Sequence, residues 1–174
     1  MLAIDFAAVK PMFGGKLSQG QVDGINHIVS AFNAHGDGLK WHLAYLLATA
    51  RHETANTMQP IKEYGLGKGH PYGKVDATGK APYGRGYVQL TWADNYKKAD
   101  AKLGLGGKLA HDYDLALDPD IAARILISGC LEGWFTGKKL GDYASFKEMR
   151  RVVNGTDRAD LIATYANSFL RSIV

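Results

Sequence analysis

Apolar residues recur at the spacing of an α-helix through much of the chain, and this pattern predicts a mainly helical fold. The first such run places its apolar residues on one helical face: Val22, Ile25, Ile28, Val29 and Phe32. Ser18 and Gln21 have the spacing of a capping box, so this helix is expected to begin after Ser18 and to end near Gly36. Beyond a turn at residues 36–38, helical spacing returns from Trp41 to Thr54.

Four further helices are predicted after residue 90. Their expected starts are Trp92, the pair Asp118-Pro119, Ser145 and Asp157. An Asp followed by Pro supplies an N-cap and a first-turn residue, and Ser145 has a Glu three residues later, as in a capping box. The helix from Trp92 is expected to end at Leu103, because the glycine-rich residues 104–107 follow it.

The segment 57–90 has no helical period and contains seven glycines and three prolines. A loop of this length in a compact domain is usually functional. Within it, Lys74–Thr78 and Tyr87–Leu90 are predicted to pair as a short β-hairpin. The sequence therefore predicts one mainly α domain of the α+β kind spanning residues 1–174, in which a small hairpin and loop region forms a cleft.

Composition fits this picture, with 46% apolar and 22% charged residues in 174. The single cysteine, Cys130, is expected to be a buried apolar residue and to form no internal disulfide. The amino terminus does not have the pattern of a signal peptide, and no apolar stretch approaches the length of a membrane span, so no stable membrane association is expected. A monomer is expected.

The net charge of +4 favours anionic partners, including acidic cell-wall polymer and nucleic acid. Nucleic-acid binders usually carry a basic cluster or a stripe of Lys and Arg flanked by aromatic residues. The chain has no such cluster, so no nucleic-acid partner is expected.

Glu53 is the first candidate catalytic residue. It follows an apolar helical face that includes Leu46 and Ala50, so its carboxyl group is expected to lie close to the core. Desolvation there favours the protonated form that a general acid needs. A glutamate at the end of a helix is often only a solvated surface charge, and that alternative stays open at this point.

Glu63, ten residues later, is the candidate for the second carboxylate. On one straight helix the two would be separated by about 15 Å, but Pro60 lets the chain turn back. A folded loop can then hold the carboxyls about 6.5 to 9.5 Å apart, which leaves room for the attacking water of an inverting glycosidase. Asp76 in the same loop is a rival, and Glu63 beside Lys62 can also be an exposed charge.

Further polar and aromatic side chains surround these carboxylates in the sequence. Thr91 can hold a water molecule or cap the helix that begins at Trp92. Arg85, between two glycines, is expected to order the loop by pairing with a carboxylate. Four tyrosines offer aromatic faces for sugar rings: Tyr64, Tyr72, Tyr83 and Tyr87.

Two other function classes were weighed. The histidines His52, His70 and His111, with Asp76 or Asp112, contain the ligand types of a zinc amidase that cuts the peptide part of the wall. Their spacing argues against this, because the chain has neither a His-Glu-x-x-His motif nor a cysteine pair, so no metal and no cofactor are expected. A non-catalytic wall-binding domain is the third class.

Four motifs in order along the chain carry a family resemblance: His52-Glu53-Thr54, residues 84–91 (Gly-Arg-Gly-Tyr-Val-Gln-Leu-Thr), Asn95-Tyr96 and residues 152–155 (Val-Val-Asn-Gly). With them the sequence resembles glycoside hydrolase family 19, in particular the bacteriophage endolysins of that family, which share a lysozyme-like fold with plant-type chitinases. Residues 17–32 resemble the first helix of the phage members. The second glutamate of plant chitinases lies in a longer, disulfide-containing loop that this chain lacks.

The resemblance implies roles for particular residues. It makes Glu53 the general acid, Glu63 the general base and Thr91 the residue that positions the attacking water. Sugar contacts are expected from the matching motif positions: Gln89, Asn95, Asn154, Tyr87 and His52.

The expected function is that of an endolysin, a lysozyme-type glycoside hydrolase that cuts the β-1,4 glycan of bacterial peptidoglycan with inversion. Chitinase activity on a β-1,4 N-acetylglucosamine polymer is the alternative. The resemblance further implies a cytolytic, antimicrobial protein that accumulates in the host cytoplasm and reaches the cell wall after another protein opens the membrane.

Overall fold

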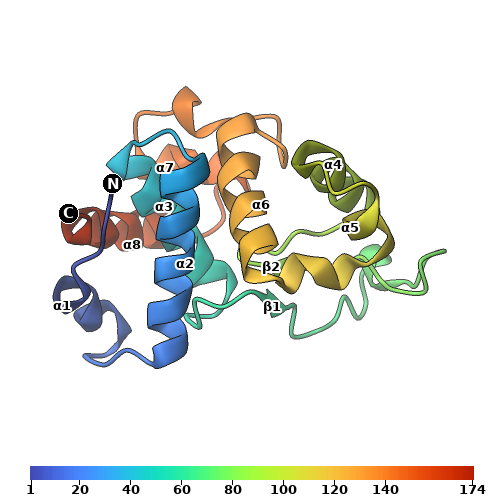
Figure 1. Cartoon of the computed structure of the whole chain (residues 1–174), viewed down its shortest axis with the longest axis horizontal. Coiled ribbons are helices and arrows are strands. Elements are labelled where there is room, and N and C mark those ends of the chain that lie inside the picture. Colours follow the sequence, from blue (N-terminus) through green and yellow to red (C-terminus); the bar gives the residue numbers. More distant parts are fainter.

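Helices account for most of the regular structure, and a single two-stranded sheet lies beside them (Figure 1). The computed structural model describes all residues, 1–174. The α-helices are α1 (Phe6–Val9), α2 (Gln19–His35), α3 (Lys40–Glu53), α4 (Ala93–Leu103), α5 (Lys108–His111), α6 (Pro119–Glu132), α7 (Phe146–Met149) and α8 (Ala159–Ser172). The strands are β1 (Ile61–Lys62) and β2 (Arg85–Gly86). The prediction of a mainly helical fold with a small β element is confirmed.

The helix α3 is buried along most of its length and delivers the first candidate carboxylate. Every residue from His42 to Ala50 is buried, so this helix is covered on all sides. It packs along α8 and also contacts α2 and α6. Its last residue, Glu53, leaves this packed environment where the chain turns away from the core.

The predicted helix starts were largely correct. Ser18 caps α2 with both hydrogen bonds of a capping box, and the helix ends at Gly36. The Asp118 carboxylate accepts from the backbone amides of residues 120 and 121 at the start of α6. Ser145 caps the short helix α7, and α4 ends at Gly104 in the left-handed conformation.

The start of α8 differs from the prediction. Its N-cap residue is Arg158, with φ of 55° and no side-chain cap, rather than Asp157. The Asp157 carboxylate lies instead 4.0 Å from Nη2 of Arg150, and its backbone carbonyl accepts from Nε of Arg150. The aspartate therefore belongs to the surroundings of a buried arginine, which the local sequence pattern did not indicate.

The predicted hairpin partners were wrong. β1 pairs antiparallel with β2, Ile61 opposite Gly86 and Lys62 opposite Arg85, so the sheet closes the two ends of the long loop. Residues 76–80 form a turn because the Asp76 carboxylate accepts from the backbone amide and hydroxyl of Thr78. The segment 87–90 folds back on β2, where Leu90 and Arg85 exchange both backbone hydrogen bonds.

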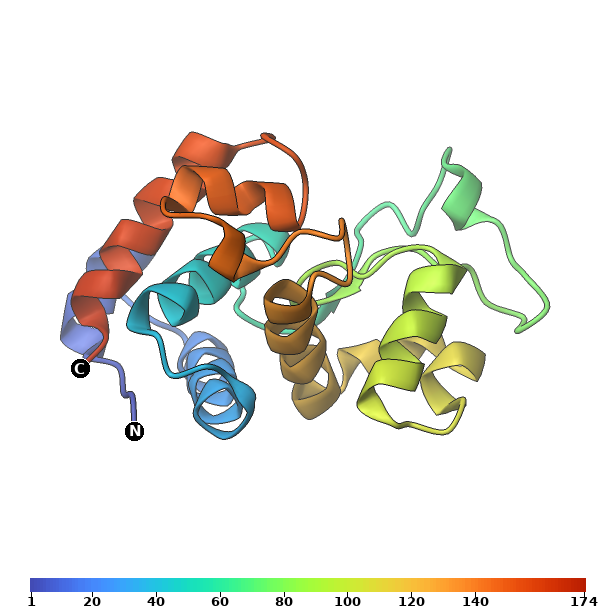
Figure 2. The same ribbon diagram turned by 90° about the horizontal axis from the view of Figure 1, so that it is seen from above.

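The helix α6 separates two groups of elements (Figures 1 and 2). On one side lie α1, α2, α3, α7 and α8, and on the other lie α4, α5 and the long loop. Cys130 on α6 is fully buried and free, as expected of an apolar core residue, and burial raises the pKa of its thiol. No helix in the chain has the length and apolar character needed to cross a bilayer.

Candidate active site

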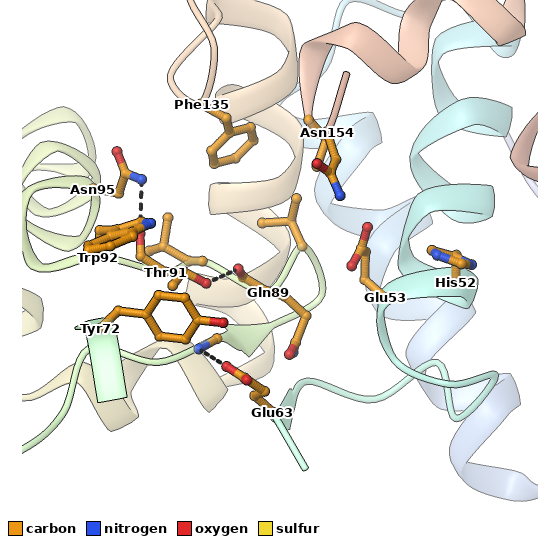
Figure 3. Close-up of a pocket in the computed structure, with 14 residues that line it drawn as sticks. His52, Glu53, Glu63, Tyr72, Gln89, Thr91, Trp92, Asn95, Phe135 and Asn154 are labelled. Atoms are coloured by element: carbon orange, nitrogen blue, oxygen red, sulfur yellow. Dashed lines mark hydrogen bonds between the residues drawn. The ribbon is translucent and has the colours of Figure 1, made fainter. Parts of the chain in front are cut away.

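A cleft of about 580 Å³ opens where the end of α3 meets the long loop (Figure 3). Its walls come from α3, from the loop up to the start of α4, and from the segments after α6 and α7. Four residues predicted from the sequence to bind or react with substrate line this cleft: His52, Glu53, Glu63 and Thr91. The predicted amides line it as well: Gln89, Asn95 and Asn154.

Glu53 projects into the cleft from the last position of α3 (Figure 3). Its side chain is 18% exposed, and its Oε1 accepts a hydrogen bond of 2.8 Å from Nη1 of Arg150. Arg150 is itself 1% exposed, so this is a partly buried ion pair. The predicted position near the core is correct, and the carboxyl group has in addition a charged partner that the sequence did not indicate.

Glu63 lies on the opposite wall, directly after β1 (Figure 3). Its backbone amide donates to the carbonyl of Gly84 at 2.8 Å, and its Oε2 accepts from the amide of Gly84 at 3.1 Å. The strand pairing thus fixes both the backbone and the carboxylate of this residue. Lys62 does not pair with it, since its Nζ lies 3.2 Å from Asp114 instead.

Tyr72 completes the surroundings of Glu63 on the same wall (Figure 3). Burial raises the pKa of the Tyr72 hydroxyl, and the neighbouring Glu63 carboxylate raises it further. The tyrosine therefore keeps its proton and can donate it in a hydrogen bond to this carboxylate.

Asp76, the rival second carboxylate, does not line the cleft. It is held in the turn at residues 76–80 by Thr78, and the hydroxyl of Tyr113 donates to its other oxygen at 2.5 Å. These hydrogen bonds lower the pKa of Asp76. Its two oxygens are thus occupied within the loop, and Glu63 is the carboxylate that faces Glu53.

Thr91 lines the cleft beside Gln89, on the side of Trp92 and Asn95 (Figure 3). Its hydroxyl donates to the carbonyl of Gln89 at 2.8 Å, which leaves the oxygen free to accept from a water molecule. It does not cap α4, whose N-cap residue is Trp92 with no side-chain cap, so the capping alternative is wrong. Asn95 Nδ2 donates to the Thr91 carbonyl at 2.9 Å and holds this segment from the other side.

The side chain of Gln89 holds the two strands together through hydrogen bonds. Its Nε2 donates to the carbonyls of Ile61 at 3.1 Å and Gly86 at 3.2 Å, and so joins the two strands. Its φ of 53° is unusual for a residue other than glycine, and such conformations persist where the surrounding structure enforces them. Gln89 therefore connects the positions of Glu63 and Thr91.

Arg85 orders the loop as predicted. It is 2% exposed and its Nε donates to Oδ1 of Asp114 at 2.7 Å. Its Nη1 donates to the carbonyls of Ala81 and Tyr83, both at 3.0 Å. Although burial by itself raises the pKa of the Asp114 carboxyl, Arg85 and Lys62 more than offset it and lower that pKa to about 2.

Comparisons with known proteins were made on the whole chain. No family model and no curated protein matches it. Chitinase C from Streptomyces griseus HUT6037 is 23% identical, with a TM-score of 0.67 over 97% of this chain and 77% of that chain. A mutant of chitinase C is 25% identical, with a TM-score of 0.68 over 97% of this chain and 93% of that chain. A class IV chitinase of family 19 from Zea mays is 19% identical, with a TM-score of 0.57 over 97% and 92% of the two chains.

The chain has the fold of the family 19 chitinases. The expected resemblance to glycoside hydrolase family 19 is thereby confirmed for the fold. This likeness supports a glycoside hydrolase that acts on a β-1,4 glycan. The cleft with its two carboxylates lies at the junction between α3 and the long loop of this chitinase fold.

Of the predicted aromatic sugar contacts, only Tyr72 lines the cleft of the chitinase fold. Tyr87 is fully buried, so its predicted contact with substrate is wrong, and burial raises the pKa of its hydroxyl. Tyr83 lies against the guanidinium of Arg85, and Tyr64 is exposed outside the cleft.

Two aromatic residues of the cleft and the partner of Glu53 were not predicted from the sequence. Trp92 and Phe135 both line the cleft, and Trp92 follows Thr91 directly with a φ of 75°. Trp92 directly follows the motif of residues 84–91, and this position could have indicated that it lines the cleft. Phe135 and Arg150 lie far along the chain from the loop, and nothing in their local sequence indicated where they would pack.

The residues of the zinc alternative are dispersed. His52 lines the cleft, where burial lowers the pKa of its imidazole, while His70 stacks on Tyr72 and His111 ends α5. No three His, Cys, Asp or Glu side chains come together in an arrangement that could hold a metal ion.

Proposed function

We propose that this protein hydrolyses the β-1,4 glycan of bacterial peptidoglycan as an inverting muramidase. The observation that carries the proposal is the pair of carboxylates, Glu53 and Glu63, which face one another from opposite walls of one cleft that Thr91 also lines (Figure 3). Two carboxyl groups that flank a bound sugar with room for a water molecule are what single displacement requires.

In the proposed reaction Glu53 is the general acid. Arg150 hydrogen-bonds to Oε1, so the other carboxyl oxygen is available to carry the proton. That proton passes to the glycosidic oxygen as the bond from the anomeric carbon to this oxygen breaks. Bound sugar excludes water from the cleft, so that the proton passes to the substrate and not to solvent.

Glu63 is the general base in the same step. A water molecule held by the Thr91 hydroxyl attacks the anomeric carbon from the face opposite the leaving group and gives its proton to Glu63. The Gly84 amide bonded to Oε2 of Glu63 keeps the carboxylate directed into the cleft. The new bond forms opposite the broken one, so the anomeric configuration inverts.

The choice of peptidoglycan rests on charge and on the motif resemblance to endolysins. A net charge of +4 suits a wall polymer whose peptides carry carboxylates. Chitin cleavage is the second candidate, because the similar solved structures are chitinases. Both polymers contain β-1,4-linked N-acetylglucosamine, so the same carboxylate pair serves either reaction.

Mass spectrometry of digested polymers tests the proposal. Purified peptidoglycan and chitin oligosaccharides are incubated with the protein and with the Glu53→Gln variant. We expect peptidoglycan fragments that end in a reducing N-acetylmuramic acid, and none with the variant. Products from chitin alone would support the chitinase candidate instead, and loss of stem peptides from an intact glycan would contradict both.

The biological setting belongs to the same proposal and rests on the resemblance. In it the protein is a bacteriophage endolysin that acts as a monomer, accumulates in the host cytoplasm and lyses the cell once the membrane is opened. Lysis of living cells, and therefore antimicrobial action, then depends on access to the wall.

A further inference from the structure

A short basic loop, residues 67–74, stands at the outer rim of the cleft (Figure 2, the projecting green segment). It surrounds a separate hollow of about 550 Å³ whose walls contain no hydrophobic side chain. Two lysines and a histidine line this hollow: Lys68, Lys74 and His70. The proposed catalytic steps use none of them.

Two glycines close the base of the basic loop. The backbones of Gly67 and Gly73 pack so closely that an added Cβ on Gly73 would lie 1.9 Å from the carbonyl oxygen of Gly67. An added Cβ on Gly67 would lie 2.6 Å from Cα of Gly73, and Gly67 has a φ of 72°. Lys68 and Lys74 each follow one of these glycines directly, so the contact holds the starting points of both side chains near one another.

The lysines of the basic loop differ from their neighbours in having no acidic partner. Lys62 and Lys80 both pair with Asp114, and Lys80 pairs with Asp112 as well. Lys68 and Lys74 are exposed and form no ion pair, and no Asp or Glu occurs between residues 64 and 75. Their positive charge is therefore available to a ligand.

An aromatic chain connects the basic loop to the cleft. The His70 ring stacks on Tyr72 with centroids 4.8 Å apart and an interplanar angle of 5°. Tyr72 in turn meets Trp92 edge to face at 5.2 Å, and both of these residues line the cleft (Figure 3). A glycan that packs on Tyr72 and Trp92 thus contacts the loop that carries both lysines.

We propose that the basic loop binds carboxylate groups attached to the glycan in the cleft, and so makes the enzyme select an anionic wall glycan over an uncharged one. This inference rests on the proposed function and names the substrate feature that the same site recognises. Tyr72 and Trp92 supply apolar faces for the sugar, and the two ammonium groups supply the charge preference. Exposed pairs of this kind are weak singly and are screened by salt.

The test compares one polymer in two charge states. Soluble peptidoglycan fragments are used as purified, or after their carboxyl groups have been converted to amides. The variants are Lys68→Ala/Lys74→Ala and a control, Lys16→Ala/Lys108→Ala, which removes two exposed lysines elsewhere. The value of kcat/KM is measured for each on both polymers, at low salt and with about 0.5 M salt. At the higher concentration, exposed charges interact over only a few ångström.

We expect the Lys68→Ala/Lys74→Ala variant to lose about fivefold in kcat/KM on the charged polymer, through KM, and nothing on the amidated polymer. The loss should disappear at high salt, and the control should match the wild type throughout. A variant that equals the wild type on the charged polymer, or that loses equally on both polymers, would overturn the inference while leaving the proposed function intact. Failure of the wild type to cleave either polymer would contradict the proposed function itself.

Discussion

At the residue scale, the position of Glu53 is determined by a buried helix and a buried arginine. It ends a helix that is buried along nine consecutive residues, and a guanidinium with 1% exposure holds one of its oxygens. The position of this carboxyl group is therefore fixed by the core and by one charged partner together.

The substitution Glu53→Gln keeps the shape of the side chain and removes the transferable proton. Activity on peptidoglycan is expected to fall by at least about a hundredfold, which is the scale of general acid catalysis. Initial rates of turbidity loss on purified walls measure it. The circular dichroism and melting temperature of the variant should stay close to those of the wild type, and near-normal activity in a folded variant would contradict the role of Glu53.

Glu63 and Asp76 provide a matched pair of substitutions in one loop. Glu63→Ala should be nearly inactive, because no group then takes the proton of the attacking water. Asp76→Ala should keep most of the activity, because its carboxylate is bonded to Thr78 and Tyr113 outside the cleft. Rates on natural substrate, with and without azide as a small nucleophile for the empty face, decide between them.

Azide is expected to raise turnover of Glu63→Ala and to leave Asp76→Ala unchanged. An inactive Asp76→Ala beside an active Glu63→Ala would mean that the base had been misassigned. Loss of activity in both variants, with unchanged folding, would show that the turn at residues 76–80 also controls the cleft.

At this scale the predictions from sequence placed residues in the cleft where a motif defines their position. Glu53 and Thr91 line the cleft because short-range order places the end of α3 and the segment before α4. Glu63 lies outside the four motifs and reaches the cleft through the pairing of β1 with β2. The burial of Tyr87 depends on packing that its local sequence does not reveal. The same holds for Arg150, whose contact with Glu53 joins residues 97 positions apart.

At the scale of elements, the position of Glu63 depends on how the long loop is held. β1 and β2 contain only two residues each, so side-chain hydrogen bonds also hold the loop in place. Gln89 bonds to both strands, and Arg85 of β2 bonds to Asp114. Asp114 belongs to the 3₁₀ turn Tyr113–Leu117 that precedes α6. The buried arginine is therefore one of the anchors between the loop and the helical part, beside the ion pairs of Lys62 and Lys80 with Asp114.

This anchor predicts a pH-dependent stability. The pKa of Asp114 is lowered to about 2 in the folded protein, below the value of about 3.9 for an unfolded aspartate. The folded state thus favours the charged form, so the contribution is fully present above about pH 4 and is lost as the pH falls toward 2. Asp114→Asn should lower the melting temperature at pH 7.

The difference in melting temperature between wild type and Asp114→Asn should shrink steadily as the pH is lowered from about 4 to 2. Thermal unfolding followed by circular dichroism across that range measures it. A difference that stays constant with pH would show that the ion pair with Arg85 does not stabilise the fold, and that the variant acts through packing alone.

Elements were predicted well wherever a cap or a long apolar period marks them. The helices α2, α3, α4 and α6 agree with their predicted spans within a few residues. The pairing of β1 with β2 was not predicted, because two-residue strands separated by more than 20 positions leave no periodic signal. Likewise Arg158, in a left-handed conformation, begins α8 without any capping side chain.

At the scale of the whole molecule, the chain combines a chitinase fold with a positive net charge and a basic loop at the rim of its cleft. The fold class followed from the sequence because helical periodicity extends over most of the chain. The division into two groups of elements on either side of α6 did not, since it depends on packing between helices distant in sequence (Figure 1).

The proposed setting predicts a conditional lysis. Cells that express the protein in the cytoplasm should keep growing until the membrane is permeabilised, and culture turbidity should then fall within minutes. Cells that express Glu53→Gln should not lyse after the same treatment. Lysis before permeabilisation would contradict the proposed dependence on a second, membrane-opening protein.

The central claim is that Glu53 and Glu63 act as acid and base in a single displacement across the cleft. Proton NMR of the first-formed product tests it most directly, because the anomeric signal is read before mutarotation mixes the two forms. From a β-1,4 glycan we expect a product that appears first as the α anomer, because single displacement inverts the configuration. First appearance of the β anomer would contradict it, because retention requires a covalent or substrate-assisted intermediate in place of the water held between Thr91 and Glu63.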